Sequence, residues 1–457
     1  MSISAAIQYF KKNLRKILFT TPSHSQGVYV PPVVEKYLGR KYFENDLSEI
    51  DCLDNLSNPK HCIKESMKNA AEVYGAQTTF YLTNGSSSGI VALMCACLGV
   101  GDKVLINRNC HKSVYNGLVL SGAFPVWTDI EVDEEWDFIK PITPELIESA
   151  LLSNSGIKAV IITNPTYEGM IADVEKIVTV CQKYGVILIV DEAHGALWNF
   201  SESFPQTALQ QGADASVQSL HKTAGAINPC ALLHLSKNSK ISAEKVQEAL
   251  NLINTTSPSY PALLDIEFTV DFLNTKEGKK QINELISNIK DFQKKLMECD
   301  NIRIYCVQND ITKLLIQIEG LSGISLSEIL YNEHNIEVEM ASERSILCLT
   351  GIGTTKNKLN KLLKALIKIA KNANSYNSSP QVSSCLSYIK PEIACTPRQA
   401  FYAKSVEIDF DKSVGKIAKS MQLDYPPGIP IIIPGEVIKQ QHLDYLKKHC
   451  DTIKVIV

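Results

Sequence analysis

Two stretches decide the fold and the chemistry expected from it: GVILIVDEAHG, residues 185–195, and SVQSLHKT, residues 216–223. The first is a short aliphatic run that ends in Asp191, and the second follows another apolar run and carries Lys222. Short apolar runs bounded by polar residues are typical of buried strands. Ligands of open α/β sheets bind beyond the carboxyl ends of the strands. We therefore expect the Asp191 carboxylate and the Lys222 amine to face one crevice at the edge of a sheet.

The surrounding chain predicts a mostly parallel sheet. Seven apolar runs alternate with segments of helical periodicity: Thr79–Leu82, Lys103–Asn107, Pro125–Thr128, Lys158–Thr163, Val186–Val190, Ala213–Val217 and Ala231–Leu235. Parallel strands joined by helices form sheets that are covered on both faces. We predict an α/β fold with a mostly parallel seven-stranded sheet, helices on both of its faces, and smaller α+β C-terminal domains.

Four segments are expected along the 457 residues. Residues 1–20 have apolar positions every three or four residues with basic residues between them, which predicts an amphipathic helix. Such a helix can bind membranes, but docking on its own protein or on a partner subunit is the favoured interpretation. Residues 21–299 are expected to form the major domain with its connecting helices, and residues 300–374 a small α+β domain. A polar linker, Asn372–Pro380, then leads to a C-terminal domain at 381–457.

The composition favours an ordinary globular protein of the cytoplasm. The net charge of −3 argues against electrostatic binding of nucleic acid, and no apolar run approaches the ~20 residues of a membrane span. The N-terminus lacks a signal-peptide core. The 13 cysteines show neither a disulfide framework nor a CxxC pair, so we expect reduced thiols and no zinc or other metal site.

An acid and an amine across one crevice suit the cofactor pyridoxal 5'-phosphate (PLP). A lysine binds the PLP aldehyde as a Schiff base, and a carboxylate at the pyridinium nitrogen keeps the electron-withdrawing ring protonated. At roughly 4 Å and an effective dielectric near 20, this attraction is about 4 kcal/mol before desolvation. His194 follows Asp191 closely and is a candidate proton carrier. A lysine in a polar loop is otherwise more often a solvated surface charge.

Two further loops follow predicted strands and suit a phosphorylated ring. Leu82–Gly89 opens a helix with Gly85, Ser86 and Ser87, and free N–H groups at a helix start bind anions. A helix cap with a flexible turn explains this loop equally well. His111 can stack on a flat ring, although a lone histidine is more often a structural polar residue.

The sequence Asp191-Glu192-Ala193-His194 also matches a helicase-type ATPase box. That function requires the phosphate loop GxxxxGK[ST], which this sequence does not contain. The ATPase interpretation is excluded on that ground.

Taken together and in this order, these segments resemble the Orn/Lys/Arg decarboxylase family of fold-type-I PLP enzymes. The resemblance covers nearly the whole chain from residue 21 onward. It is carried by Thr83–Gly89, Asn107–Ser113, Pro165–Gly169, Val190–Gly195, Gln218–Thr223, Thr396–Phe401 and Tyr425–Pro430.

The resemblance implies a role for each candidate site residue. Lys222 would form the Schiff base, Asp191 would hold the pyridinium and His111 would stack on the ring. His194 would lie near the reacting face. The residues implied around the phosphate are Gly85, Ser86, Ser87, Ser219 and His221. A loop at Thr256–Tyr260 matches a family loop near the active site, one that can reach the phosphate of a partner subunit.

The activity implied is α-decarboxylation of a basic L-amino acid, giving CO2 and a di- or polyamine for polyamine biosynthesis. Arginine is favoured over lysine and ornithine because the chain resembles the short, biosynthetic form of the family. A homodimer or larger assembly is implied as well. Asp46 and Glu49 are candidates to pair with the distal cation of the substrate, although a solvated acidic loop is the more ordinary interpretation.

Two departures from the family pattern keep other functions open. Ser23 and Ser25 replace the usual Gly and Lys of one loop, and Ala224–Pro229 replaces the usual Leu-Pro-x-Leu-Thr-Gln. A PLP aminotransferase, a catalytically impaired PLP-binding homologue and a structural partner without PLP remain alternatives.

Overall fold

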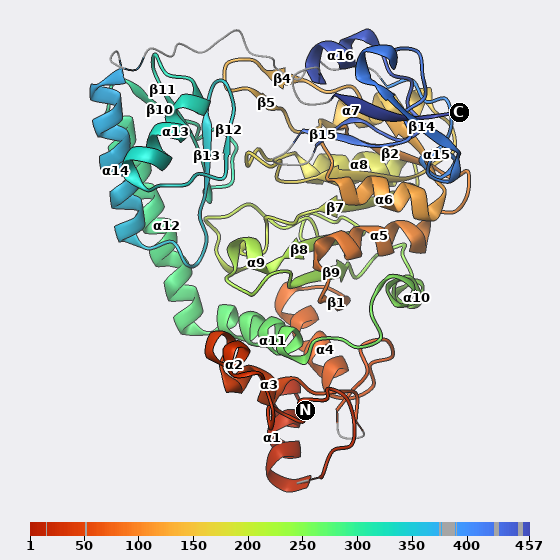
Figure 1. Ribbon diagram of the computed structural model, residues 1–457, viewed down its shortest axis with the longest axis vertical. Coiled ribbons are helices and arrows are strands. Elements are labelled where there is room, and N and C mark those ends of the chain that lie inside the picture. Colours follow the sequence, from red (N-terminus) through yellow and green to blue (C-terminus); the bar gives the residue numbers. More distant parts are fainter. Residues whose placement is uncertain are drawn as a thin grey trace.

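The computed structural model describes residues 1–14, 16–50, 53–373, 376, 389, 391–424, 429–446 and 451–457. Its centre is a seven-stranded sheet in the order β1-β9-β8-β7-β6-β2-β3 (Figure 1). The strands are β1 (Thr78–Leu82), β2 (Lys103–Ile106), β3 (Phe124–Trp127), β6 (Ile157–Thr163), β7 (Ile187–Asp191), β8 (Ala215–Ser219) and β9 (Ala231–Leu235). Each contains or overlaps one of the seven predicted runs.

The direction of the strands confirms the predicted mostly parallel sheet. β3, β2, β6, β7 and β8 pair in parallel. β9 is antiparallel to both of its neighbours, β8 and β1. Because β6, β7 and β8 run the same way, Thr163, Asp191 and Ser219 all stand at one edge of the sheet.

Helices cover both faces of this sheet, as predicted. On one face lie α5 (Gly85–Cys97), α6 (Lys112–Ser121) and α10 (Ala243–Ile253). On the other lie α7 (Pro144–Ser153) and α8 (Val174–Lys183). Successive residues of a strand point to opposite faces of the sheet. Ile161 therefore packs in the apolar cluster under α5, α6 and α10, and Val160 packs in the cluster under α7 and α8.

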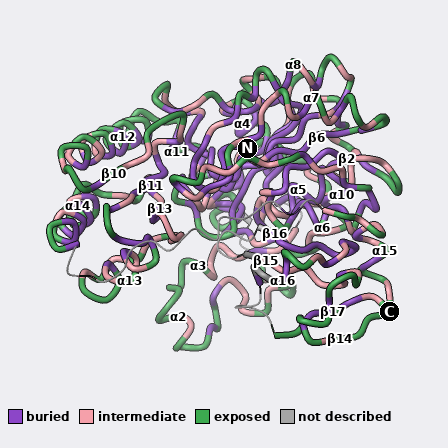
Figure 2. Tube along the Cα trace, turned by 90° about the horizontal axis from the view of Figure 1, so that it is seen from above, coloured by how far each residue is buried: buried purple, intermediate pink, exposed green. Residues whose placement is uncertain are grey.

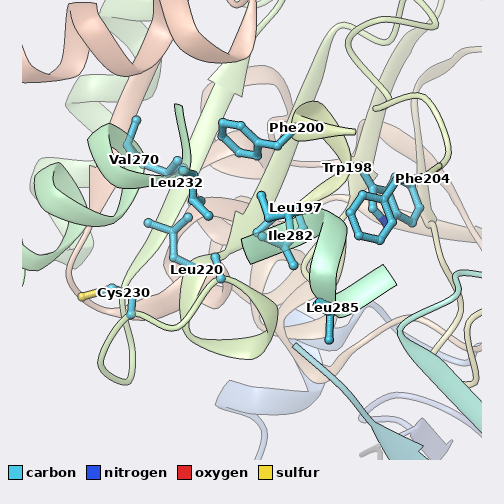
Figure 3. Close-up of a cluster of buried hydrophobic side chains, with 14 of the residues drawn as sticks. Leu197, Trp198, Phe200, Phe204, Leu220, Cys230, Leu232, Val270, Ile282 and Leu285 are labelled. Carbon is cyan, nitrogen blue, oxygen red and sulfur yellow. The ribbon is translucent and has the colours of Figure 1, made fainter. Parts of the chain in front are cut away.

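The amino-terminal helices and one edge of the major part share a third core. It includes α4 (Cys62–Tyr74) and α11 (Tyr260–Asn274) together with the long helix α12 (Lys276–Met297). Figure 3 shows part of this core, in which Leu197, Trp198 and Leu220 are buried side chains. These three residues flank His194 and Lys222 in the sequence, so the core fixes the backbone on which both stand.

Helix α12 leads to a second, four-stranded antiparallel sheet in the order β10-β11-β13-β12 (Figure 1). Its strands are β10 (Ile302–Ile304), β11 (Lys313–Ile318), β12 (Met340–Ala341) and β13 (Ile346–Leu349), and its helices are α13 (Gly323–His334) and α14 (Lys356–Lys371). A short hairpin of β4 (Val132–Asp133) and β5 (Phe138–Ile139) belongs to the major part.

The carboxy-terminal part has its own small core beside α6. It contains α15 (Pro397–Tyr402), β14 (Ser405–Asp409), β15 (Gln422–Asp424), β16 (Ile429–Ile432), α16 (Gln440–Leu446) and β17 (Thr452–Ile456). The predicted linker and the segment Tyr425–Pro430 lie mostly outside the described residues.

The amino-terminal helix is shorter than predicted. An α-helix, α1 (Ile3–Tyr9), passes into a π-helical turn at Phe10–Leu14, and Ile17 is 87% exposed. The helix docks on its own chain, because Glu267 of α11 accepts hydrogen bonds from the N–H groups of Ile3 (2.7 Å) and Ser4 (2.9 Å). Residues 16–19 are not helical although Leu18 still packs against this core, so the predicted helix ends earlier than residue 19.

The segment that follows is largely exposed, in contrast to the buried sheet (Figure 2). It contains α2 (Pro32–Leu38) and α3 (Arg40–Asn45). No helix in the described part of the chain combines the length and the apolar character needed to cross a membrane.

Candidate active site

A cavity of about 720 Å³ lies at the carboxyl ends of β6, β7 and β8. All nine residues that the sequence analysis predicted for the site line it: Gly85, Ser86, Ser87, His111, Asp191, His194, Ser219, His221 and Lys222. They come from four separate segments of the chain, and the parallel sheet brings those segments to one edge.

Asp191 and Lys222 face this cavity from neighbouring strands. Asp191 is the last residue of β7, is 5% exposed and accepts a hydrogen bond from the Ala193 N–H (3.2 Å). Lys222 stands on a short helix, α9 (Leu220–Thr223), that directly follows β8. Burial lowers the pKa of the Lys222 amine, and the negative charges of Asp191 and Glu339 oppose that shift. The expected acid and amine therefore share one cavity.

The start of α5 lines the cavity and is suited to bind an anion. Gly85, the first residue of the helix, has φ +77°, a conformation that favours glycine. The Ser219 hydroxyl donates to the Ser86 hydroxyl at 2.9 Å, and Ser87 lines the same wall. Free N–H groups at the start of a 13-residue helix, with these hydroxyls, are suited to a phosphate.

His221 lies at the same end, with Nδ1 3.1 Å from the Cys230 carbonyl oxygen. A carbonyl only accepts, so Nδ1 carries the hydrogen of this bond. Burial lowers the pKa of the His221 imidazole. A phosphate would supply the negative charge that favours a second proton on this ring.

His111 caps α6 and is held by that role. Its Nδ1 accepts the Ser113 N–H at 3.2 Å and lies 2.9 Å from the Ser113 hydroxyl. Nε2 therefore carries the ring hydrogen when the imidazole is neutral. Burial lowers the pKa of His111, which favours the neutral ring that stacking requires.

His194 stands between two lysines. Its Nε2 is 3.1 Å from Lys222 Nζ, and its Nδ1 is 2.5 Å from Lys313 Nζ. Burial and the charges of both lysines lower the pKa of His194 well below its usual range. The Tyr167 ring packs edge-on against the imidazole, with centroids 5.4 Å apart.

Lys313 and Glu339 are site residues that the sequence does not predict. Lys313 is 119 positions from its partner His194 and opens a strand of the second sheet, so no local pattern joins them. Glu339 lines the cavity and accepts a hydrogen bond from the Tyr167 hydroxyl. Tyr167 belongs to Pro165–Gly169, one of the segments that carry the family resemblance, and this was the one sequence feature that pointed towards Glu339.

The lining also has polar atoms ready for a ligand. Thr163 Oγ1 and Asn109 Oδ1 are buried and have no hydrogen-bond partner within the described residues, and both residues line the cavity. Buried polar atoms are rarely left unpaired. An anion site, a carboxylate, an imidazole and a poised amine together fit PLP, the group that the resemblance implies.

Several other predicted positions do not reach the cavity. Asp46 pairs with His24 (3.2 Å), and Glu49 accepts from the Asn55 amide (2.6 Å). Neither acid lines this cavity, because their loop packs against its own neighbours, so their pairing with the substrate stays a prediction. The Tyr260 side chain is also buried, with its hydroxyl donating to the Asp54 carbonyl at 2.6 Å.

One departure from the family pattern does reach the cavity. Asn228 and Pro229, the end of the altered segment Ala224–Pro229, line its wall. Within the described residues, no group of three or more His, Cys, Asp or Glu side chains is placed to hold a metal ion.

Two family models match separate regions of the chain. The model "Orn/Lys/Arg decarboxylase, major domain" matches residues 3–316. The model "Orn/Lys/Arg decarboxylase, C-terminal domain" matches residues 381–455.

Individual proteins resemble the chain over nearly its full length. It is 34% identical to the arginine decarboxylase of Bacillus subtilis (strain 168) over 448 residues, covering 95% of this chain and 91% of the relative. It is 32% identical to the arginine decarboxylase of Bacillus anthracis over 462 residues, covering 98% of this chain and 92% of the relative. The solved structure of lysine decarboxylase A from Pseudomonas aeruginosa superposes with a TM-score of 0.87 at 20% identity, covering all of this chain and 80% of that one.

Proposed function

The chain belongs to the Orn/Lys/Arg decarboxylase family, and from that premise we propose that it is a PLP-dependent decarboxylase of a basic L-amino acid. Arginine is the favoured substrate, followed by lysine and ornithine. The observation that carries the proposal is that Lys222 and Asp191 line one cavity with the serines at the start of α5.

Each residue has a defined task in this proposal. PLP, when bound, supplies a ring that takes up the electron pair of the bond broken at the substrate Cα. Asp191 would keep a proton on the ring nitrogen, and His111 would stack against the ring. The residues that bind the phosphate are Ser86, Ser87, Ser219 and His221.

Lys222 and His194 handle the protons of the reaction. Lys222 Nζ would hold the cofactor through its aldehyde, and its buried amine is placed to do so. His194 Nε2 is 3.1 Å from Lys222 Nζ, so these two nitrogens can hold the proton that Cα accepts after CO2 departs. The buried position of His194 keeps bulk water from that proton.

Glu339 supports the choice of a basic substrate. It is the second carboxylate of the cavity lining besides Asp191, and the Tyr167 hydroxyl holds it. A guanidinium or ammonium at the end of the substrate would pair with this carboxylate. A neutral side chain would leave the carboxylate without that partner.

The test is release of labelled CO2 from carboxyl-labelled arginine, lysine and ornithine by the full-length protein with added PLP. The proposal expects release with arginine as the best substrate. A keto acid without CO2 would instead support the aminotransferase alternative.

An impaired homologue remains the second candidate because the altered residues Asn228 and Pro229 line the cavity. Absorbance of lysine-bound PLP without release of CO2 from any of the three amino acids would support it.

We also propose that the protein is a homodimer or larger assembly. The segment before α3 exposes large apolar side chains, among them Phe19 (97%) and Tyr37 (81%), and such surfaces mark interfaces. Light scattering after gel filtration measures the mass of the assembly, and a monomer would contradict the proposed homodimer.

We also propose that the protein is cytoplasmic. The ten described cysteines are all free, which suits the reducing cytoplasm.

A further inference from the structure

Lys313 is a buried lysine directly behind the cavity. Its side chain is 1% exposed, it is the first residue of β11, and it is not among the cavity-lining residues. Its Nζ is 2.5 Å from His194 Nδ1 and 5.5 Å from the centroid of the Tyr167 ring. An ammonium that is withdrawn from water in this way is costly unless its contacts compensate.

The Lys313 side chain packs closely against the backbone at Gly169. Gly169 has φ +101°, and a Cβ at that position would stand 2.5 Å from Lys313 Cγ. A larger residue would therefore push the lysine away from His194. The absence of a side chain at Gly169, in the loop after β6, therefore leaves the space that Lys313 occupies.

A neutral imidazole can accept only one hydrogen bond at its ring nitrogens, because one nitrogen carries the hydrogen. His194 faces an amine at each nitrogen. If the Lys313 ammonium donates to Nδ1, then Nε2 carries the hydrogen and points at Lys222 Nζ. An amine that meets an N–H donor must accept, so Lys222 is then uncharged.

We propose that Lys313 is a positioning residue that acts through His194: its ammonium selects the imidazole form with hydrogen on Nε2, which holds Lys222 as the free amine. This inference rests on the proposed function, since Lys222 is taken as the residue that binds the PLP aldehyde. A free amine is the form that attacks an aldehyde.

Three carboxylates around Lys313 favour its ammonium form against the cost of burial. Burial lowers its pKa to about 7, and the carboxylates of Asp310, Glu339 and Glu168 oppose the shift while Lys222 adds to it. Asp310 is itself engaged by the Trp198 indole N–H (3.2 Å) and the Thr312 N–H (2.9 Å). The titratable groups that face Lys313 are thus His194, Tyr167, Asp310, Glu168, Glu339 and Lys222.

The first test measures the protonation of Lys222 in the cofactor-free, full-length protein. Competitive acetylation over a range of pH, read on the Lys222 peptide by mass spectrometry, reports the pH at which this amine becomes reactive. In Lys313→Met that pH is expected to rise by about one unit, which is about tenfold slower acetylation at a given pH below it. Methionine keeps an unbranched side chain in the space at Gly169 but removes the donor and the charge.

Two variants control this measurement. Lys112→Met removes a charge from an exposed lysine that lines the same cavity, and a shift of less than about half a unit is expected. Lys313→Arg keeps a donor and a charge, and the profile of the wild type is expected. An unchanged profile in Lys313→Met, or equal shifts in Lys313→Met and Lys112→Met, would overturn the proposal.

The second test needs no variant at position 313, so it stands even if Lys313→Met does not fold. Nitrogen-15 NMR of histidine-labelled wild-type protein distinguishes hydrogen on Nδ1 from hydrogen on Nε2, and His194→Gln identifies the signal. The proposal expects hydrogen on Nε2, and hydrogen on Nδ1 would overturn it. Neither test uses substrate, so a lack of decarboxylase activity would leave both outcomes readable.

Discussion

Glu436→Ala is expected to destabilise the protein strongly, because it removes the counter-ion of a buried arginine. Arg108 lies in the loop between β2 and α6 that also carries His111, and its side chain is 6% exposed. Its Nη2 is 2.9 Å from Glu436 Oε2 and 2.6 Å from the Ile431 carbonyl oxygen, so it joins the carboxy-terminal part to the loop that holds His111.

The magnitude follows from what Arg108 would keep. Breaking a buried ion pair by removing one partner costs about 3–5 kcal/mol. Arg108 retains the Ile431 carbonyl and the face of Trp127, 5.1 Å from the guanidinium carbon, so about 3 kcal/mol is expected. Urea unfolding followed by tryptophan fluorescence measures it, with Trp127 as a local reporter.

A surface ion pair provides the matched control. Lys183 Nζ and Glu148 Oε1 are 2.6 Å apart, but their side chains are 63% and 34% exposed. Glu148→Ala should cost far less than Glu436→Ala, because exposed ion pairs contribute little to stability. Equal losses in Glu436→Ala and Glu148→Ala would refute the argument from burial. The double variant Arg108→Met with Glu436→Leu should be more stable than Glu436→Ala, because no charge is left buried.

Three further predictions concern the cavity, the loop after β6 and a buried histidine. Glu339→Gln should lower kcat/KM for arginine about tenfold, because the ion pair between Glu339 and the guanidinium of the substrate is lost. Norleucine has no cation, so its kcat/KM should not fall, and equal effects on both substrates would contradict the pairing of Glu339 with the substrate. Gly169→Ala should cost about 2 kcal/mol more than Gly156→Ala in urea unfolding, because both have positive φ but only the first meets Lys313; equal costs would exclude the clash. Burial lowers the pKa of His234 to about 3, so the unfolded chain binds a proton below about pH 6.5 that the folded protein refuses. Stability should therefore fall by up to about 1.4 kcal/mol per pH unit from 6.5 towards 3, and His234→Gln, unlike the surface variant His61→Gln, should reduce that loss.

The sheet and the main site residues could be predicted because their signals are local. Asp191 directly follows an apolar run, and Lys222 comes five residues after the next one. The carboxyl ends of parallel strands lie at one edge of the sheet, so both residues are expected there. The serines at the start of α5 carry the pattern of a helix start in the same way. Each of these short segments therefore shows both the reactive residue type and its place at the end of a strand or the start of a helix.

Lys313 and Glu339 could not be found that way, because a second sheet brings them to the site. Nothing near Lys313 in sequence marks it as the partner of His194. Asp46 and Glu49 had suitable charge, but the path of their loop depends on contacts with His24 and Asn55 that no periodicity reveals.

The central claim is that Lys222 is the amine that binds PLP. Full-length protein is mixed with PLP, reduced with borohydride and digested, and the peptide that carries the pyridoxyl group is identified by mass spectrometry. The account predicts the label on Lys222, and its loss in a folded Lys222→Ala variant. A label on Lys112 or Lys313 of the wild type, with Lys222 unmodified, would contradict it.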